Sequence, residues 1–543
     1  MIVAHENDHD TVVQSTLVPQ IWTINLDFSV SPIAVTVEGD GCLIQHQGES
    51  QNLYWNNCGR WQFFLVVEAK DAYLTASGGH VCPIYVRRIG NTIRLSNVAS
   101  RLMQPSDTLR IDAFVLLQNL SGLPYPQNNF FKEIRLLEAS AEYRLTAYGI
   151  ERLRSVLEGA TVLSQDEVLD MAITHWEEHL SSGADVAVLL SGGYDSRLNL
   201  AIACHAARRY GNRVKAFHEH KNVHEESIAI AVASAAGIPL IVHNRRKFLR
   251  ADRAVVLDPS FIDLQSGFYR DNLIRWHNYL GYIRTELPGC VIMGLGAEAH
   301  KGKFYRQIES IAADALKVFG IDDIVVKAIA RKLGLVHQDQ DSQRSFFETL
   351  ALQATAFGDF AAQVDYVHYQ TYIANGYGHR CHDLQQYYGI PFPFLDNRFL
   401  AAVFALPQNK KENFALVKRG IERLGPTLAT IPYSSANDKA LGPAVRKPAT
   451  DAMRGIVRLL GPIYYDWFPP SRKGRANITP AEREVLAAIR SNSHLTDLLT
   501  RLALESIEKI PFIRMDYLIE ACLYFSLLEQ KMGVICTIDG GEA

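Results

Sequence analysis

One stretch of this 543-residue chain constrains its fold more than any other: a buried strand that runs into a paired-glycine turn and then into a helix. The strand is predicted at residues 186–190, the turn at 191–196 (SGGYDS), and the helix begins at once. Adjacent glycines let the backbone turn tightly and approach a ligand closely. Their N–H groups, the serine hydroxyls and the helix N-terminus together form a cradle for an anion, and a phosphate fits it.

The acidic residue inside this turn narrows the class of ligand that the turn can bind. Asp195 does not suit an anion alone, but it suits Mg²⁺ held between the carboxylate and phosphates, because hard cations take oxygen ligands from both. No GxxxxGK[ST] motif occurs, so the P-loop of kinases and GTPases is excluded. The alternative is a plain strand-to-helix turn capped by Asp and Ser. The strand, turn and helix in register favour the phosphate loop.

The segments around the turn alternate between helix and strand. Apolar spacing predicts helices at 167–180, 197–211 and 225–238, and strands at 185–190, 214–220 and 239–244. This order implies a parallel sheet covered on both faces. Residues 21–152 show short alternating runs punctuated by Gly, Asn and Asp, which predict antiparallel strands and one helix near 112–119. Helices are expected to predominate after about residue 350.

Length and composition limit the class of protein. A chain this long is expected to form two to four domains, and we place them at 1–160, 161–443 and 444–543, the last a helical extension. With 55 Lys+Arg against 58 Asp+Glu, the net charge of −3 argues against a nucleic-acid binder. No apolar run reaches the roughly 18–20 residues of a membrane helix. Eight scattered cysteines without a CxxC pair predict reduced thiols and a cytoplasmic location.

The turn and several later motifs resemble one family. SGGYDS resembles the SGGxDS pyrophosphate loop of the N-type ATP pyrophosphatases, and the pattern over roughly residues 20–443 is similar to the asparagine synthetase family. Residues 294–299 (GLGAEA) resemble its GEGADE loop, and its PFLD signature stands at residues 393–396. The resemblance implies an α/β fold: a parallel-sheet synthetase domain of the adenine nucleotide α-hydrolase type behind a degenerate Ntn-glutaminase-like β-sandwich, itself α+β.

The same resemblance implies a chemistry and a set of site residues. A substrate carboxylate attacks the α-phosphorus of ATP, pyrophosphate leaves, and an amine or ammonia displaces AMP to form an amide. Mg²⁺ is expected on Asp195 and Glu298, although Glu298 replaces an Asp of the family and Ala299 its adjacent Glu. The residues expected to contact ATP are Leu190, Ser191, Gly192, Gly193, Asp195, Ser196, Phe217 and Gly296.

Two further side chains are candidates for catalysis. Lys439 lies closest to a late lysine that stabilises the adenylate in the relatives, although its spacing to Gly442 is one residue too long, and Lys447 is the reserve. Arg380 suits a substrate carboxylate or phosphate, because arginine matches such groups with two bonds. A structural ion pair is the alternative for Arg380. The KGKFYRQ run that begins at Lys301 is interpreted as a solvated or substrate-rim segment without a role.

The front domain lacks the nucleophile of its relatives. The family's glutaminase uses an N-terminal cysteine, whereas Ile2 follows Met1 here and Cys42 and Cys58 are internal. We therefore expect no glutamine hydrolysis. The expected partners are a small-molecule or peptide carboxylate, an amine or ammonia donor, and either a second copy of the chain or a protein that supplies ammonia.

Two rival functions stay open. One is an intramolecular cyclase of the lasso-peptide or β-lactam type, and the other is a non-catalytic ATP-binding scaffold. Residues 294–299 also satisfy the GxGxxA dinucleotide fingerprint, but that fingerprint normally serves a first βαβ unit and this one comes late. We therefore expect no NAD site there.

Overall fold

A computed structural model of the chain describes its central parts and several shorter segments. The described residues, with short gaps inside some ranges, are 3–5, 22–39, 42–57, 60–112, 116, 130–220, 223–244, 282–301, 350–433 and 524–538. They combine helices with both parallel and antiparallel sheets, so the protein is of the α/β class. The predicted helix at 112–119 and the tail from 444 to 523 lie almost wholly outside the described residues.

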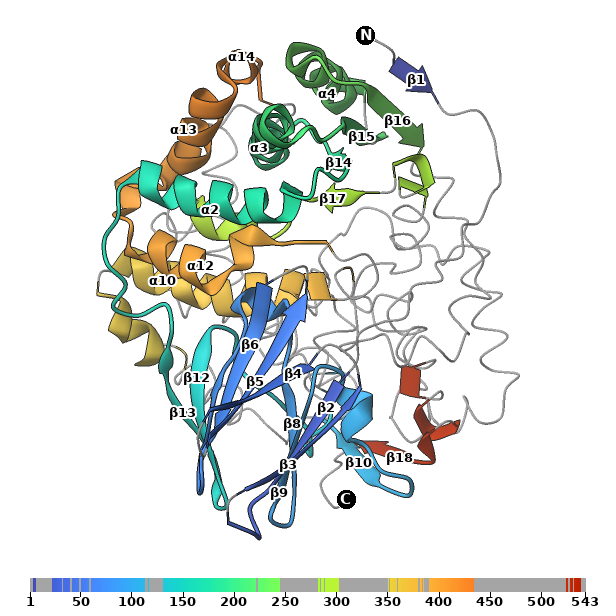
Figure 1. Cartoon of the computed structure of the whole chain (residues 1–543), viewed down its shortest axis with the longest axis vertical. Coiled ribbons are helices and arrows are strands. Elements are labelled where there is room, and N and C mark those ends of the chain that lie inside the picture. Colours follow the sequence, from blue (N-terminus) through green and yellow to red (C-terminus); the bar gives the residue numbers. More distant parts are fainter. Residues whose placement is uncertain are drawn as a thin grey trace, which may run out of the picture.

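A five-stranded parallel sheet is built from the segments that alternate in the sequence. Its strand order is β1-β16-β15-β14-β17, and every neighbouring pair is parallel. The strands are β1 (Val3–His5), β14 (Val186–Leu189), β15 (Val214–His220), β16 (Leu240–Asn244) and β17 (Cys290–Ile292). The three predicted strands are confirmed. Figure 1 shows this sheet in the upper half, with β1, close to the N-terminus, at its edge beside β16.

The three helices predicted at 167–180, 197–211 and 225–238 are confirmed, each beginning two or three residues earlier than predicted, and further helices follow residue 350. They are α2 (Gln165–Leu180), α3 (Tyr194–Tyr210), α4 (Val223–Ala236), α10 (Phe360–His368), α12 (Asn397–Ala405), α13 (Ala415–Leu424) and α14 (Pro426–Ala429). Helix α2 begins with a capping box in which Ser164 and Glu167 bond reciprocally to each other's backbone N–H. Helix α3 ends at Gly211, whose φ of 80° is left-handed and favours glycine.

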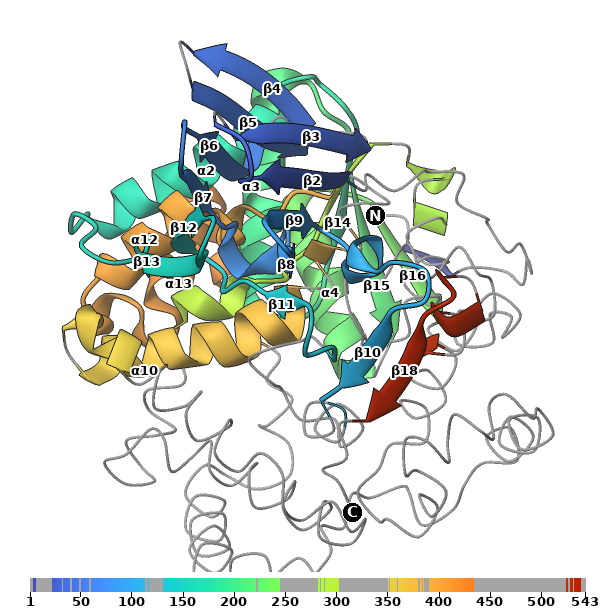
Figure 2. The same cartoon turned by 90° about the horizontal axis from the view of Figure 1, so that it is seen from below.

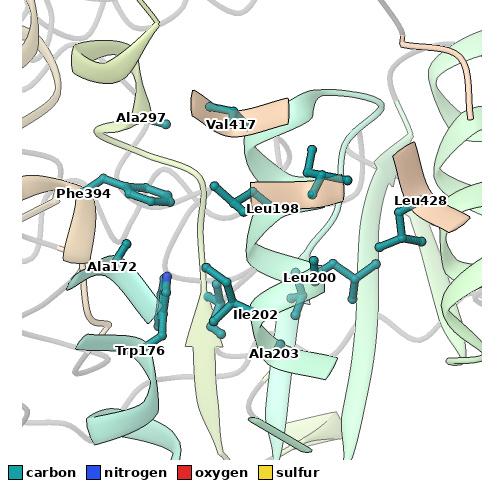
Figure 3. Close-up of a cluster of buried hydrophobic side chains, with 14 of the residues drawn as sticks. Ala172, Trp176, Leu198, Leu200, Ile202, Ala203, Ala297, Phe394, Val417 and Leu428 are labelled. Atoms are coloured by element: carbon teal, nitrogen blue, oxygen red, sulfur yellow. The ribbon is translucent and has the colours of Figure 1, made fainter. Parts of the chain in front are cut away.

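Both faces of the parallel sheet are buried, as predicted. Successive residues of β14 point to opposite faces, so Val186 and Val188 pack against α2, α3 and α4, while Ala187 packs in a second cluster with residues of α10. Figure 3 shows part of the first cluster, including Trp176 of α2 and Leu198 of α3. Burial on both faces explains why β14 and β17 are continuous apolar runs.

The strands between Trp22 and Ser155, apart from β10 (Thr108–Ile111), form two antiparallel sheets, of orders β11-β8-β9-β2-β3 and β13-β12-β7-β6-β5-β4. Their facing apolar side chains share one buried cluster, so the sheets pack on each other as in a sandwich. The strands are β2 (Trp22–Asp27), β3 (Ala34–Gly39), β4 (Cys42–Gln47), β5 (Ser50–Asn57), β6 (Arg60–Val67), β7 (Ala72–Thr75), β8 (Tyr85–Ile89), β9 (Thr92–Ser96), β11 (Arg135–Leu136), β12 (Ala141–Thr146) and β13 (Gly149–Ser155). We call this unit the antiparallel part and the unit around the parallel sheet the parallel part.

A short strand near the C-terminus also reaches the antiparallel part. Strand β18 (Ile535–Ile538) pairs in parallel with β10 (Thr108–Ile111), and Figure 2 shows the two side by side. None of the helices in the described ranges combines the length and apolar character needed to cross a membrane.

Close backbone approach joins the two parts. The turn η1 (Gly78–His80) of the antiparallel part lies against η7 (Tyr369–Gly378) and against Leu395 of the PFLD signature. A Cβ added at Gly78 or Gly378 would lie less than 3.0 Å from a backbone oxygen of the other part, that of Leu395 or of Gly79. Only glycine fits such an approach, so these positions hold the parts in contact.

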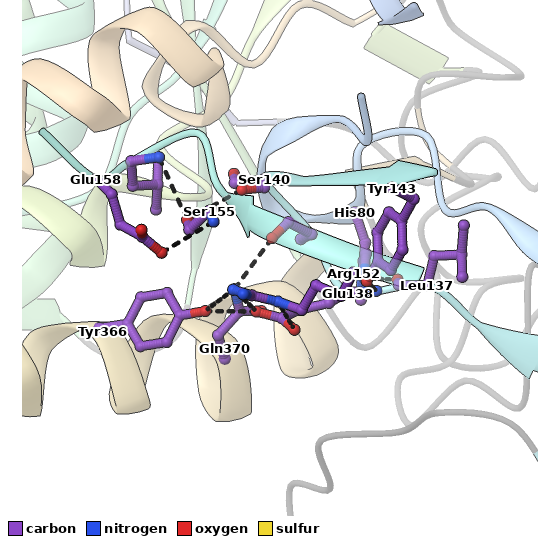
Figure 4. Close-up of polar contacts among 12 residues, drawn as sticks. His80, Leu137, Glu138, Ser140, Tyr143, Arg152, Ser155, Glu158, Tyr366 and Gln370 are labelled. Carbon is purple, nitrogen blue, oxygen red and sulfur yellow. Dashed lines mark hydrogen bonds and ion pairs between the residues drawn. The ribbon is translucent and has the colours of Figure 1, made fainter. Parts of the chain in front are cut away.

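A polar network crosses the same interface (Figure 4). Arg152 of β13 donates to Glu138 at 2.9 Å, and Tyr366 of α10 donates to the same carboxylate. Gln370 also donates to Glu138, at 3.2 Å, and to the carbonyl of Ala139 at 3.0 Å. These buried or half-buried groups satisfy one another's hydrogen-bonding capacity. Tyr366 therefore helps to hold the parallel part against the antiparallel part.

Two buried histidines at this interface make stability depend on pH. Burial lowers the pKa of His80 to about 4 and that of His382 to about 3, and their rings contact the carbonyls of Leu137 and Val81. In the unfolded chain both pKa values return to about 6.5. Neutral imidazoles therefore favour the fold above that pH, and this stability is lost as the pH falls from about 6.5 towards 4.

We expect each histidine to cost about 2 kcal/mol of unfolding free energy between about pH 6.5 and pH 5, at about 1.4 kcal/mol per pKa unit. Urea unfolding at a series of pH values measures this loss. The variant His382→Gln should have a shallower pH dependence than the wild type. Equal slopes for the two proteins would contradict the assignment.

Candidate functional site

The candidate site lies where the order of the strands in the parallel sheet reverses. The chain builds β14, then β15 and β16 on one side of it, and then returns to place β17 on the other side. The loops that follow β14 and β17 therefore leave neighbouring strands at the same edge of the sheet. Ligands of open α/β sheets bind at this kind of switch point, outside the carboxyl ends of the strands. The two sequence motifs, SGGYDS and GLGAEA, are these two loops.

The loop after β14 is fixed by its two serines. Ser196 Oγ lies 3.0 Å from Ser191 Oγ and accepts a hydrogen bond of 3.0 Å from the N–H of Ser191. The N–H of Gly193 donates to Ser191 Oγ at 3.2 Å, and a Cβ added at Gly193 would crowd that oxygen. Gly193 is the N-cap of α3, so the N–H groups of the first turn, which have no partners inside a helix, open at this loop.

A buried arginine that was not predicted as a site residue connects the phosphate loop to a later segment of the chain. Arg197 follows SGGYDS and is fully buried. Its guanidinium donates to the carbonyls of Ile431 at 2.7 Å, Pro432 at 3.0 Å and Leu428 at 3.2 Å, and to that of Gly192 at 3.4 Å. Burial lowers its pKa. The loop is thereby tied to the segment that follows α14.

Two carboxylates, one from each loop, meet at a single ammonium group. Lys301 Nζ lies 2.6 Å from Asp195 Oδ2 and 3.4 Å from Glu298 Oε1, and the side chain of Lys301 is only 10% exposed. Burial acts to raise the pKa of Asp195, but His300 and Lys301 outweigh it and hold the pKa below its usual range. Burial acts to lower the pKa of Lys301, but Asp195 and Glu298 outweigh it and raise that pKa.

This lysine corrects the sequence analysis. The KGKFYRQ run was interpreted as a solvated or substrate-rim segment, but its first residue is buried and ion-paired at the centre of the site. The physical reason is that η5 (Ala297–His300) turns the chain back towards the phosphate loop, which brings Lys301 over Asp195. The rest of the run, residues 302–307, lies outside the described residues.

A buried histidine also faces the carboxylates. The side chain of His300 is 1% exposed, and its Nε2 lies 3.8 Å from Asp195 Oδ1, too far for a hydrogen bond. Neither ring nitrogen has a hydrogen-bond partner among the described residues, and the ring packs edge-on against Phe394 at 4.8 Å between centroids. A buried imidazole without a partner is costly, so this position points to a ligand at the site.

The donor set fits a divalent cation. Asp195 Oδ1 and Glu298 Oε2 are buried, and neither has a hydrogen-bond partner in the described part of the chain. Buried carboxylate oxygens of this kind are ligands that Mg²⁺ prefers. The described residues contain no group of three or more His, Cys, Asp or Glu side chains arranged to hold a metal. The two carboxylates alone fit an ion that takes its other ligands from phosphates and water.

The remaining predicted contacts have mixed placements. Leu190 and Phe217 lie in the two apolar clusters that flank the sheet, and the N–H of Leu190 donates to the carbonyl of Phe217 at 2.8 Å, so their side chains serve the core. Gly296 has a φ of 83°, and a Cβ there would lie less than 3.0 Å from the side chain of Leu395. Packing against the PFLD signature thus already requires glycine at this position.

Three aromatic side chains, which we call the aromatic rim, lie beside the phosphate loop: Tyr194, Phe414 and Tyr433. The Tyr194 ring stacks on Tyr433 with centroids 4.5 Å apart and planes 7° apart, and Phe414 lies 5.3 Å from Tyr194. Phe414 has a φ of 62°, which is uncommon for a bulky residue. Lys301 Nζ lies 5.9 Å from the Phe414 ring, so the aromatic rim borders the ammonium as well.

Both predicted catalytic side chains, Lys439 and Arg380, lie outside the described residues, as does the reserve Lys447. The PFLD aspartate, Asp396, is the N-cap of α12 and accepts bonds from two backbone N–H groups. No family model matches the chain, and no curated protein matches it either.

Proposed function

We propose that this protein is an ATP-dependent amide-bond synthetase that adenylates a carboxylate and transfers the acyl group to an amine or ammonia. The observation that carries the proposal is the meeting of Asp195 and Glu298, from two neighbouring loops, beside a glycine-lined anion cradle at the switch point of the sheet. An anion cradle next to a cation site is what the triphosphate of ATP requires.

Each part of the loop has a distinct task in this proposal. The N–H groups of the first turn of α3 bind the β- and γ-phosphates, and the hydrogen bonds of Ser191 and Ser196 keep the loop in shape. Asp195 and Glu298 would hold Mg²⁺, which when bound neutralises charge on the leaving pyrophosphate. Arg197 fixes the loop to residues 428–432 by hydrogen bonds, so the loop keeps its conformation when the triphosphate binds.

The proposed reaction consists of two successive displacements. A carboxylate oxygen attacks the α-phosphorus, and the bond from that phosphorus to the bridging oxygen breaks as pyrophosphate leaves with the electron pair. The amine nitrogen then attacks the acyl carbon, AMP leaves with the second pair, and the amine gives up a proton. This sequence of steps requires exclusion of water from the adenylate and fixed donors for the departing charge.

The proposal includes no glutaminase step. Cys42 stands at the start of β4, paired with Trp55 inside the antiparallel part, and β2 and β3 precede it in the chain. Exposure of an α-amine at Cys42 would remove both of these strands. The nitrogen is therefore supplied as free ammonia, by another protein, or as an amine of the substrate.

The test is a pyrophosphate exchange assay with the full chain, ATP, Mg²⁺ and pools of carboxylic acids. At least one pool should support exchange of labelled pyrophosphate into ATP, and mass spectrometry with ¹⁵N-ammonia then reports the product. Added ¹⁵N indicates ammonia as donor, whereas a product one water lighter than its substrate indicates ring closure. ATP binding without exchange in any pool would make the protein a scaffold and contradict the proposal.

A further inference from the structure

The ammonium of Lys301 lies where a cation for the two carboxylates would bind. It contacts Asp195 at 2.6 Å and Glu298 at 3.4 Å, one oxygen of each, and leaves the other oxygen of each buried without a hydrogen bond. Two carboxylates and one ammonium leave a single net negative charge. An Mg²⁺ ion has to displace the ammonium or share these oxygens with it, at a site whose attraction for a divalent ion has been halved.

We propose that Lys301 is a built-in counter-ion that keeps the divalent cation out of the free protein and releases the two carboxylates only when a triphosphate arrives. The metal then enters with the nucleotide and not before it. This inference rests on the proposed function only for the identity of the triphosphate. It assigns Lys301 a positioning role, because the lysine acts through the two carboxylates.

Three features of the site support an exchange of this kind. Lysine is a flexible four-carbon stem with a point charge, so its ammonium can turn from a carboxylate to a phosphate without a change of backbone. The cradle of Gly193 and the first turn of α3 places that phosphate next to Asp195, which is itself in this turn. The Phe414 ring, 5.9 Å from Nζ, offers the ammonium a second favourable contact as it moves.

The surroundings of His300 indicate independently that a ligand binds at this site. Its ring is buried, its two nitrogens have no hydrogen-bond partner in the described ranges, and Nε2 faces Asp195 Oδ1 at 3.8 Å. A carboxylate pair that was complete with Lys301 alone would not leave both an imidazole and two carboxylate oxygens unsatisfied. The resting ion pair is therefore a partial substitute for the loaded site.

The test measures Mn²⁺ binding by electron paramagnetic resonance, because Mn²⁺ takes the same oxygen ligands as Mg²⁺. In the absence of nucleotide, wild-type protein should bind Mn²⁺ weakly, and Lys301→Met should bind it at least about tenfold more tightly, because one positive charge has been removed. With the non-cleavable α,β-methylene analogue of ATP, the wild-type protein should hold Mn²⁺ in the ternary complex.

A matched control uses a second lysine near the loop. Lys418 of α13 lies over the Tyr194 ring at 5.4 Å, and Lys418→Met should leave Mn²⁺ binding without nucleotide at the wild-type level. If Lys301→Met does not fold, Lys301→Gln replaces it, because the glutamine amide donates to carboxylates without a charge.

The outcomes separate this inference from the proposed function. Equal Mn²⁺ affinity of the wild-type and Lys301 variants without nucleotide overturns the counter-ion role and leaves ATP binding intact. A wild-type protein that binds neither Mn²⁺ nor the analogue, while Lys301→Met binds Mn²⁺ alone, supports the blocking role and contradicts the proposed function.

Discussion

The variant Asp195→Asn is expected to lose Mg²⁺-dependent ATP binding by at least about 100-fold, or about 2.7 kcal/mol. The amide keeps the shape of the side chain but removes one of the two charges that the divalent cation requires, and it leaves Lys301 with Glu298 as its only carboxylate contact from this pair. Pyrophosphate exchange should fall with it. Calorimetric titration with the α,β-methylene analogue of ATP, with and without Mg²⁺, measures the loss.

Asp185→Asn is the matched control for this prediction. Asp185 stands just before β14, at the end of the strand away from the phosphate loop, and bonds to the exposed Arg213 at 2.8 Å. Removal of its charge should leave ATP affinity unchanged. Circular dichroism should show both variants folded. Unchanged nucleotide affinity in folded Asp195→Asn protein would contradict the metal assignment and, with it, the proposed chemistry.

The fold was predictable where local chemistry and tertiary packing agree. Strand β14, helix α3 and the end of α3 at Gly211 follow from an apolar run, a helical period and a residue suited to a positive φ. Strands β1 and β18 were not predicted. Each is only three or four residues long, and its partner lies far away in the sequence, at β16 or β10, so neither has a local signal.

The site was predictable for the residues that the turn requires, and the two carboxylates Asp195 and Glu298 were expected from cation chemistry and from the family resemblance. The glycines and serines of SGGYDS are needed by the turn, and that need is visible in the sequence. Lys301 and Arg197 carry charges that are ordinarily solvated, and only the packing of β17 beside β14 and of residues 428–432 over α3 buries them. A basic residue one or two positions after each glycine-containing loop, Arg197 and Lys301, was the available signal.

The interface between the two parts is expected to be the most sensitive to an added methyl group. Gly378→Ala places a Cβ less than 3.0 Å from the carbonyl oxygen of Gly79 and from the side chain of His80. Because the first obstacle is backbone, the helix end or the η1 turn has to move, and the nearby bond from the N–H of Gly79 to Tyr369 is disturbed.

We expect a loss of about 3 kcal/mol in unfolding free energy for Gly378→Ala, at the upper end of the cost of overpacking. Urea unfolding followed by tryptophan fluorescence measures it, and protection of η1 in hydrogen exchange should fall in parallel, because the strain is local to the interface. Gly149→Ala, at the start of β13 with no atom within 4 Å of an added Cβ, should change stability by no more than about 0.5 kcal/mol. If the two variants are equally stable, the parts are not held together by this close approach.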